Sequence, residues 1–249
     1  MRGLFILVLS LLSLNTFAAG SKIDIPKYDW SWKGFFGTYD RASAQRGLKV
    51  YREVCAGCHS MDLIAYRNLA DLGFSEAHIK AIAAEYLIPD GPNDEGEMFE
   101  REAIPSDRFA NPYPNVQAAR AANNGAYPPD LSLIVKARPK GADYLKALLL
   151  GYVEAPADKE VPEGQYYNKY MDGNLIAMPS PLSEGIVDYD DGTEATMDQM
   201  ATDVTTFLAW AAEPSLEDRK RIGLKVILFL FVLLVLAYIS KQQIWRDIK

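Results

Sequence analysis

The sequence predicts a mostly α-helical domain with long ordered loops, followed by one C-terminal transmembrane helix. Apolar residues recur at helical spacing in several short segments, Gly, Pro and Asn separate those segments, and a nearly continuous apolar run lies near the end of the chain. Hydrophobic residues make up 49% and charged residues 24% of the 249 residues, which suits one buried core and argues against a disordered chain.

The amino end has the pattern of an export signal. Arg2 precedes an apolar run over residues 4–14, and the small residues Ala18 and Ala19 follow at a cleavage point. A first membrane helix is the alternative, but this run is too short to cross about 30 Å of hydrocarbon. We therefore expect residues 1–19 to be removed and residues 20–218 to form one exported domain.

The first predicted helices of the domain have recognisable starts. Asp40 or Ser43 can cap a helix that runs into a cysteine pair at residues 55–58. Ser75 can cap a second helix that reaches to about Tyr86. The sequence therefore places its cysteine pair at the end of a helix.

The middle of the domain is expected to be mostly loop. Residues 88–114 are rich in Gly, Pro, Asp and Asn, which predicts a long ordered loop instead of a helix or strand. Two short helices are expected after it, over residues 131–137 and 142–150, the second ended by Gly151. No strand pattern is strong.

The last helix of the domain has both a start and a stop signal. Thr196 and Gln199 have the spacing of a capping box, and Pro214 stops the helix after Glu213. Apolar residues recur at helical spacing between these ends, at Met200, Val204, Phe207, Leu208 and Ala211. This helix is expected to lead almost directly into the membrane.

The carboxyl end predicts a membrane anchor. Residues 222–240 are nearly all apolar, and at about 1.5 Å per residue they reach just under 30 Å, enough for one crossing. Lys225 lies one turn inside and can extend its ammonium to the headgroups. We expect residues 219–241 to form the anchor and residues 242–249 a short cytoplasmic tail. The flanking positive charges balance, so the export signal sets this orientation.

The net charge of −7 argues against nucleic acid and against an anionic membrane surface as main partners, and suits a basic partner. Acidic residues concentrate over residues 85–107 and again over residues 184–194. Such runs form either a docking surface or an ordinary solvated face, and composition does not decide between the two.

The strongest chemical motif is a pair of cysteines followed by a histidine. Cys55 and Cys58 are the only cysteines of the chain, and His59 follows at once, which gives the C-x-x-C-H motif of covalent haem attachment. Residues three apart on a helical turn share a face, so both thiols can form thioethers to the two vinyl groups of a haem. The motif predicts one covalently bound haem c, with His59 held under its iron.

Other interpretations of the cysteine pair fit less well. A zinc site needs four ligands, and His78, the only other histidine, supplies no second pair and is expected to be an exposed helical residue. A thioredoxin-like redox pair needs a βαβ context that the sequence lacks. A disulfide across two residues would be strained and would leave His59 without a role.

A second axial ligand would decide whether the iron carries electrons or binds small molecules. Met61 is too close to His59 in sequence to reach the opposite face of a haem. Met178 lies in an apolar loop stiffened by Pro179, so the spacing favours it, with side-chain packing as its alternative role. The propionates need polar partners from the segment between the two ligands, and the spacing does not choose among Arg120, Arg138 and Tyr144.

Several motifs in a fixed order resemble one family. They are VCAGCHSMD at residues 54–62, DGPN at 90–93, GEMF at 96–99, ARAANNGA at 119–126, PPDLS at 128–132, WAAEP at 210–214 and RKR at 219–221. Together they cover almost the whole mature chain and resemble cytochrome c1, the haem-c subunit of the quinol:cytochrome c oxidoreductase (cytochrome bc1 complex, respiratory complex III). One departure from some members is the lack of any further cysteine, so no disulfide can brace the loops.

The resemblance implies a cytochrome c-type domain and a set of site residues. It implies His59 and Met178 as axial ligands, Arg138 and Tyr144 at a propionate, and Asn123 and Pro129 lining the haem pocket. It also implies a role as an electron carrier that is enzymatic only as a subunit of quinol–cytochrome c reductase. The chain would accept one electron from the Rieske iron–sulfur protein and pass it to a cytochrome c.

The resemblance further implies a place in a larger assembly. Cytochrome b would be its neighbour in a dimeric multi-subunit complex of the cell inner membrane. The haem domain would lie in the periplasm and the C-terminus in the cytoplasm. Alternatives are a haem-c subunit of another membrane enzyme, such as a terminal oxidase or nitric oxide reductase, a haem sensor or peroxidase with an open iron site, and a purely structural anchor.

Overall fold

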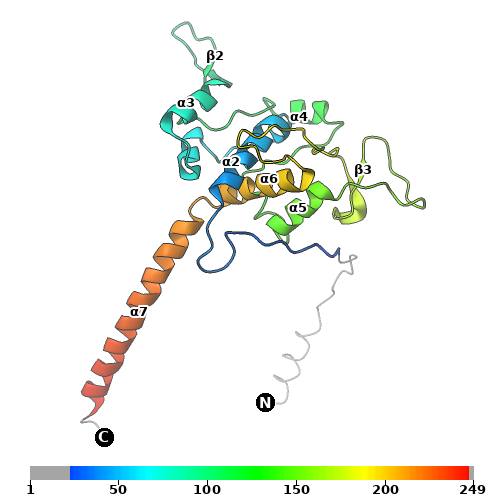
Figure 1. Ribbon diagram of the computed structural model, residues 1–249. Coiled ribbons are helices and arrows are strands. Elements are labelled where there is room, and N and C mark those ends of the chain that lie inside the picture. The colour runs from blue at the N-terminus through cyan, green and yellow to red at the C-terminus, as the bar shows by residue number, and fades with distance from the viewer. Residues whose placement is uncertain (1–22, 247–249) are drawn as a thin grey trace, which may run out of the picture.

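The computed structural model describes residues 23–246 and is mostly helical, as predicted (Figure 1). Its helices are α2 (Arg41–Val50), α3 (Glu76–Ala84), α4 (Val116–Ala122), α5 (Ala142–Leu150), α6 (Met197–Ala212) and α7 (Leu216–Trp245). Shorter helical turns are Tyr51–Cys55, Tyr66–Leu72 and Asp172–Asn174, and the strands are β1 (Leu87–Asp90), β2 (Phe99–Glu102), β3 (Tyr166–Tyr167) and β4 (Leu175–Ile176). The predicted export signal, residues 1–19, lies outside the described residues.

The core of the domain is organised by the crossing of α2 and α6 (Figure 1). Gly47 of α2 makes that crossing possible, because a Cβ atom added there would lie 2.0 Å from the carbonyl oxygen of Asp203 on α6. The predicted apolar stripe of α6 is buried, including the fully buried Met200 and Phe207. Glycine at this one position therefore allows two helix backbones to come into direct contact.

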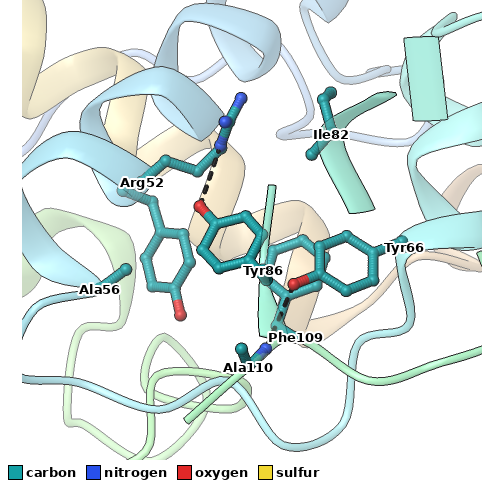
Figure 2. A pocket seen from close by; sticks show the side chains of 8 residues that line it. Arg52, Ala56, Tyr66, Ile82, Tyr86, Phe109 and Ala110 are labelled. Atoms are coloured by element: carbon teal, nitrogen blue, oxygen red, sulfur yellow. Dashed lines mark hydrogen bonds between the residues drawn. The ribbon is translucent and has the colours of Figure 1, made fainter. Parts of the chain in front are cut away.

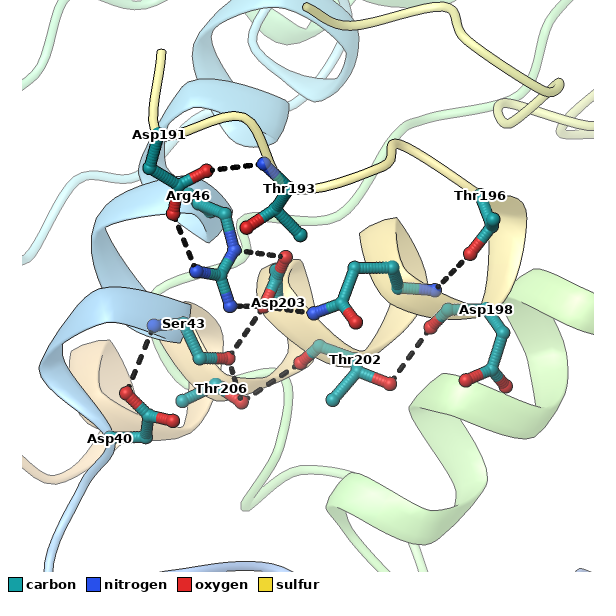
Figure 3. Close-up of polar contacts among 11 residues, drawn as sticks. Asp40, Ser43, Arg46, Asp191, Thr193, Thr196, Asp198, Thr202, Asp203 and Thr206 are labelled. Atoms are coloured by element: carbon teal, nitrogen blue, oxygen red, sulfur yellow. Dashed lines mark hydrogen bonds and ion pairs between the residues drawn. The ribbon is translucent and has the colours of Figure 1, made fainter. Parts of the chain in front are cut away.

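A polar network fastens the same two helices (Figure 3). Asp203 is fully buried and accepts hydrogen bonds from both Arg46 Nε (2.9 Å) and Arg46 Nη2 (3.1 Å). Ser43 and Gln199 donate to the same carboxylate, at 2.7 and 3.0 Å. A buried carboxylate needs such partners, and here they come from both helices.

The predicted helix starts are largely confirmed. Asp40 caps α2 by accepting from the Ser43 amide, and Ser75 caps α3, which ends at Ala84, two residues before Tyr86. Thr196 caps α6 by accepting from the Gln199 amide. The spacing of Thr196 and Gln199 predicted a capping box, and only its Thr196 half forms, because the Gln199 side chain bonds to Asp203.

The prediction of a loop without strands over residues 88–114 was wrong. Strands β1 and β2 form an antiparallel hairpin in which Leu87 pairs with Glu102 and Asp90 with Phe99. The Asn93 side chain accepts from two backbone amides of the connecting turn, and Arg101 bridges Asp90 and Asp107 at its base. These polar side chains supply the turn and cross-strand contacts that the composition alone did not reveal.

The helix predicted over residues 131–137 was also wrong, whereas α5 is confirmed with Gly151 after its end. Residues 131–137 form turns, because their polar groups bond to another segment. The Leu131 amide donates to the Ser60 carbonyl, and the Ser132 hydroxyl accepts from the Leu63 amide. Met178 lies in a loop, as predicted, and that loop begins directly after strand β4.

One helix among the described residues, α7, is long and apolar enough to cross a membrane. It contains the predicted anchor, residues 219–241, and its apolar window has a mean hydropathy of 2.8 with none of it buried inside the chain. Figure 1 shows α7 leaving the domain as a single helix directly after α6. The boundaries of the exported domain and tail stay predictions.

Candidate haem-attachment site

The cysteine motif sits at the end of α2, where the helix widens into one π-helical turn, Tyr51–Cys55. The Cys55 carbonyl then accepts from the amides of Cys58 (3.1 Å) and His59 (2.9 Å), so the three motif residues share one closed turn. Burial raises the pKa of the Cys55 thiol to about 12, and the Cys58 side chain is exposed. Both cysteines carry free thiols on a rigid turn that continues from the core helix.

His59 is oriented by a backbone carbonyl from a distant segment. Its Nδ1 lies 2.8 Å from the carbonyl oxygen of Pro129. A carbonyl can only accept, so Nδ1 carries the proton and Nε2 keeps its lone pair. Desolvation lowers the pKa of the imidazole, which favours this neutral form. The carbonyl of Pro129, a predicted pocket residue, thus leaves Nε2 of His59 with a lone pair that a metal ion could accept.

Asp130 locks the segment after the motif onto the segment that contains Pro129. Its carboxylate accepts from the Ser60 hydroxyl (3.0 Å), the Asp62 amide (2.7 Å) and the Ser132 amide (2.8 Å). The position of the Pro129 carbonyl relative to His59 follows from these bonds. Our prediction of site residues did not include Asp130, although an Asp two residues before a Ser is a known turn signal.

Asn123 is connected to the attachment turn through one tyrosine. It follows the last residue of α4 and donates from Nδ2 to the Ala119 carbonyl (2.7 Å) and to the Tyr113 hydroxyl (3.2 Å). The Tyr113 hydroxyl in turn lies 4.0 Å from Cys58 Sγ. Tyr113 therefore connects Asn123 to the exposed thiol, and it is a neighbour that the sequence did not single out.

Met178, Arg138 and Tyr144 belong to a second group, in which Met178 and Tyr144 lie near Tyr152 and Arg138 lies near Tyr144. The Tyr152 hydroxyl donates to the Met178 carbonyl at 3.0 Å and so fixes the backbone of the methionine loop. Burial raises the pKa of the Tyr144 hydroxyl, and the nearby positive charge of Arg138 opposes that rise. Arg138 is exposed, with one hydrogen bond to the neighbouring Ala137 carbonyl. Within residues 23–246 no hydrogen bond joins this group to His59.

The other methionines have different surroundings. Met61 and Met200 are fully buried in the core, whereas Met98 and Met197 are exposed. Met171 Sδ lies 3.6 Å from the Tyr144 hydroxyl. Met178 is half-buried on an ordered loop, which suits a side chain that must reach a bound group.

The remaining candidates from the sequence have other partners. Arg120 donates to the Gly125 carbonyl and lies 5.8 Å from the Tyr127 ring centroid, so its guanidinium is used within its own loop. His78 is exposed on α3, as predicted.

An aromatic cluster borders the attachment turn (Figure 2). It surrounds a cavity of about 10 Å³, room for roughly one water molecule. Tyr66 stacks on Phe109 with ring centroids 4.7 Å apart, and Arg52 donates to the Tyr86 hydroxyl. Ala56, between the two cysteines, lines the same cavity. These rings support the turn by packing and leave no space there for a large ligand.

The two acidic runs are partly neutralised within the chain. Arg46 pairs with Asp191, Lys49 with Asp190, and Arg101 with Asp90 and Asp107. The β1–β2 hairpin keeps exposed carboxylates that have no ion pair within the described residues, at Asp94, Glu95, Glu97, Glu100 and Glu102. Figure 1 shows this hairpin projecting from the domain on the side away from α7.

The residues present fit a covalently attached haem. Two free thiols three residues apart, a neutral imidazole with its Nδ1 tied to a carbonyl, and a half-buried methionine on an ordered loop make up the donor set that such a group requires. The exposed Arg138 beside Tyr144 is a suitable partner for a carboxylate.

Comparison with known proteins gives a consistent result. The family model described as the Cytochrome C1 family matches residues 30–248. Cytochrome c1 of Rhodospirillum rubrum is 49% identical over 243 residues, which are 91% of this chain and 89% of that protein. The cytochrome b-c1 complex catalytic subunit of Candida albicans is 50% identical over 233 residues, 93% of this chain and 81% of that protein. The cytochrome b/c1 protein of Bradyrhizobium diazoefficiens is 51% identical over 244 residues, and the matched region spans 36% of its length.

Proposed function

The chain belongs to the cytochrome c1 family, and from that premise we propose that it is the haem-bearing electron-transfer subunit of a quinol:cytochrome c oxidoreductase. The main support from the molecule itself is the Cys55–His59 turn, with His59 Nδ1 held by the Pro129 carbonyl and Nε2 left available. Two free thiols beside an imidazole whose Nε2 is available are what one covalently held haem c needs.

A bound haem c supplies a one-electron iron couple that needs no bond to a substrate. Cys55 and Cys58 would hold it covalently, while His59 and Met178 would ligate the iron from its two faces. Methionine as second ligand closes the iron to small molecules and raises its potential. The Tyr152 hydroxyl, through the Met178 carbonyl, keeps the methionine loop in place.

The remaining site residues would shape the surroundings of the haem. Arg138 and Tyr144 would neutralise and hydrogen-bond a propionate, since one offers a planar cation and the other a hydroxyl. Asn123 and Pro129 would line the pocket beside Cys58 and His59 respectively.

The partners follow from the family and from the charge of the surface. The name of the Bradyrhizobium relative, cytochrome b/c1, joins this kind of chain to a cytochrome b, which supports cytochrome b as the neighbour in the membrane. The electron would come from a Rieske iron–sulfur protein and go to a cytochrome c. The unpaired carboxylates of the β1–β2 hairpin are the proposed docking surface for a basic acceptor.

The proposed location is the cell inner membrane. Helix α7 would cross it once, with the haem domain in the periplasm and the carboxyl tail in the cytoplasm. Covalent haem attachment outside the cytoplasmic membrane agrees with the predicted export signal.

Purification of the tagged chain from its native membranes tests the proposal. We expect a dihaem cytochrome b and an iron–sulfur protein to copurify, and quinol to reduce added cytochrome c in the presence of the complex. Copurification with terminal oxidase or nitric oxide reductase subunits would move the chain to a different enzyme. Carbon monoxide binding to the reduced protein at neutral pH would contradict a closed iron site.

A further inference from the structure

A loop at the base of the domain exposes two adjacent aromatic side chains. Phe35 is 52% exposed. Phe36 is 80% exposed, which is more than any other large apolar side chain among the described residues. Their rings contact each other edge to face with centroids 5.0 Å apart. Exposing two neighbouring phenylalanine side chains to water costs free energy, so we expect the tip of this loop to contact an apolar partner.

The backbone of the loop is shaped to present this pair. Gly34 has φ +77°, a conformation that other residues rarely adopt. A Cβ atom at Gly37 would lie 2.1 Å from the Lys33 carbonyl oxygen, so the turn closes only with glycine there. The two glycines flank Phe35 and Phe36 and hold them at the tip of a tight bend.

Polar contacts fasten the loop to the first turns of α7. Lys220 donates from Nζ to the carbonyls of Trp32 (2.7 Å) and Gly37 (2.9 Å), one on each side of the phenylalanines. Glu217 accepts from the Tyr39 amide at 2.8 Å and pairs through both oxygens with Arg41, the first residue of α2. The loop, the start of α7 and the start of α2 therefore form one fixed unit.

The position of the loop along α7 places it at the edge of the hydrocarbon. A groove of about 390 Å³ runs between the loop and α7, with Phe35 and Phe36 on one wall and Leu224 and Lys225 on the other. The apolar run of α7 begins at Ile222, and its 19 residues are only just long enough to cross, so Ile222 must lie near one boundary. Leu224 and Lys225 then lie within about one helical turn, roughly 5 Å, of that boundary, and the groove is at the same depth.

We propose that Phe35 and Phe36 insert into the outer leaflet of the membrane beside α7, as a second membrane contact that fixes the orientation of the haem domain. The occupant of the groove is a phospholipid of that leaflet, because the groove is continuous with the lipid-facing surface of α7 and its lining is amphipathic. Phe35, Phe36 and Leu224 offer apolar surface for an acyl chain. The charged lining residues, which include the cations Arg221 and Lys225 as well as Glu217 and Asp218, suit a zwitterionic headgroup. Phenylalanine side chains of segments that lie on a membrane surface are buried at this depth, at the boundary between headgroups and acyl chains. This inference rests on the proposed membrane crossing by α7.

Photo-crosslinking in intact membranes tests the contact. Phe36 is replaced by p-benzoylphenylalanine in the assembled, haem-containing protein, and the irradiated chain is weighed by mass spectrometry. We expect an adduct that adds the mass of one phospholipid. The matched control is the same replacement at Phe99 of the distant β1–β2 hairpin, which is 44% exposed and should give no lipid adduct.

A crosslinker at a third position tests the membrane crossing by α7 independently of the contact made by Phe35 and Phe36. The same replacement at Phe231, in the middle of α7 and 62% exposed, should also give a lipid adduct. Lipid adducts at Phe231 but not at Phe36 would overturn the second contact and leave the anchor intact. An adduct between Phe36 and another protein subunit would equally overturn it, whereas no adduct at Phe231 would contradict the membrane crossing itself.

Discussion

Replacing Gly47 by alanine tests the packing of α2 against α6, because two physical effects predict opposite signs. Alanine favours a helix over glycine by about 1 kcal/mol, so propensity alone predicts a more stable protein. The new methyl group would lie 2.0 Å from the Asp203 carbonyl oxygen, against 3.4 Å for ordinary contact, a shortfall of about 1.4 Å. A further contact would be 2.8 Å from Phe207 Cβ.

The steric effect should win for Gly47→Ala. The group in the way is backbone and cannot rotate aside, so the helices must separate, and overpacking of this kind typically costs about 1–3 kcal/mol. We expect the upper end of that range and a net loss of about 1–2 kcal/mol after the gain in helix propensity. The midpoint of thermal unfolding should then fall by roughly 2–8 °C for a domain of this size.

Thermal unfolding of the detergent-purified chain, followed by near-ultraviolet circular dichroism, measures this effect. The control is Gly223→Ala, because Gly223 is also helical and an added Cβ there meets nothing within 4 Å. That variant should be as stable as the parent or slightly more stable. If Gly47→Ala unfolded at the same temperature as the parent or higher, the close helix crossing would be refuted.

The other predictions concern the polar network, the hairpin, the docking surface and the iron. Asp203→Asn should lower the free energy of unfolding by about 3 kcal/mol in denaturant titrations, since it leaves the charge of Arg46 without its buried partner; an unchanged midpoint would show that the pair is dispensable. Arg101 donates to Asp107 and thereby lowers the pKa of that carboxyl. The pair therefore contributes fully to the free energy of unfolding above the pKa of an unfolded Asp, about 3.9, and this contribution is lost as the pH falls through the lower pKa of the folded state. Amide hydrogen exchange in the hairpin should accelerate over that acid range relative to exchange in an unprotected peptide at the same pH, and Arg101→Gln should remove most of this dependence on pH. Reduction of a basic cytochrome c should slow as ionic strength rises through about 0.1 M, where the Debye length is near 10 Å; a rate independent of salt would exclude docking through the hairpin. Met178→Leu should abolish the sulfur-to-iron absorption band and lower the reduction potential, and an unaltered spectrum would assign the second ligand elsewhere.

The sequence predicted those features whose cause is local. Asp40, Ser75 and Thr196 cap helices through bonds that span three residues, and the apolar stripe of α6 follows from helical periodicity. Features that depend on distant segments were missed. The reciprocal half of the capping box failed because the Gln199 side chain bonds to Asp203, whose carboxylate also binds Arg46 of α2.

In the candidate site too, local features could be predicted from the sequence and contacts between distant segments could not. Cys55, Cys58 and His59 could be recognised because the chemistry requires them at fixed spacing. Nothing in their spacing indicated that the Pro129 carbonyl would orient His59, or that Asp130 would hold that carbonyl in place. Those roles arise only when segments 70 residues apart are brought together. The family resemblance implied Pro129 as a pocket residue, and neither it nor the spacing indicated Asp130.

The contacts along α2 connect the membrane helix to the haem-attachment turn. Glu217 at the start of α7 binds Arg41 at the start of α2, and α2 runs about 15 Å from there, without a break, into the turn that carries Cys55. Gly47 and the Arg46–Asp203 pair keep that helix pressed against α6 over the same distance. The rate of electron transfer falls steeply with the distance between donor and acceptor. A carrier that must meet its partners above a membrane therefore benefits when its attachment turn is held at a fixed height above that membrane. In this chain α2 sets the height of the attachment turn, because Arg41 ties its start to α7 and its end continues into the turn itself.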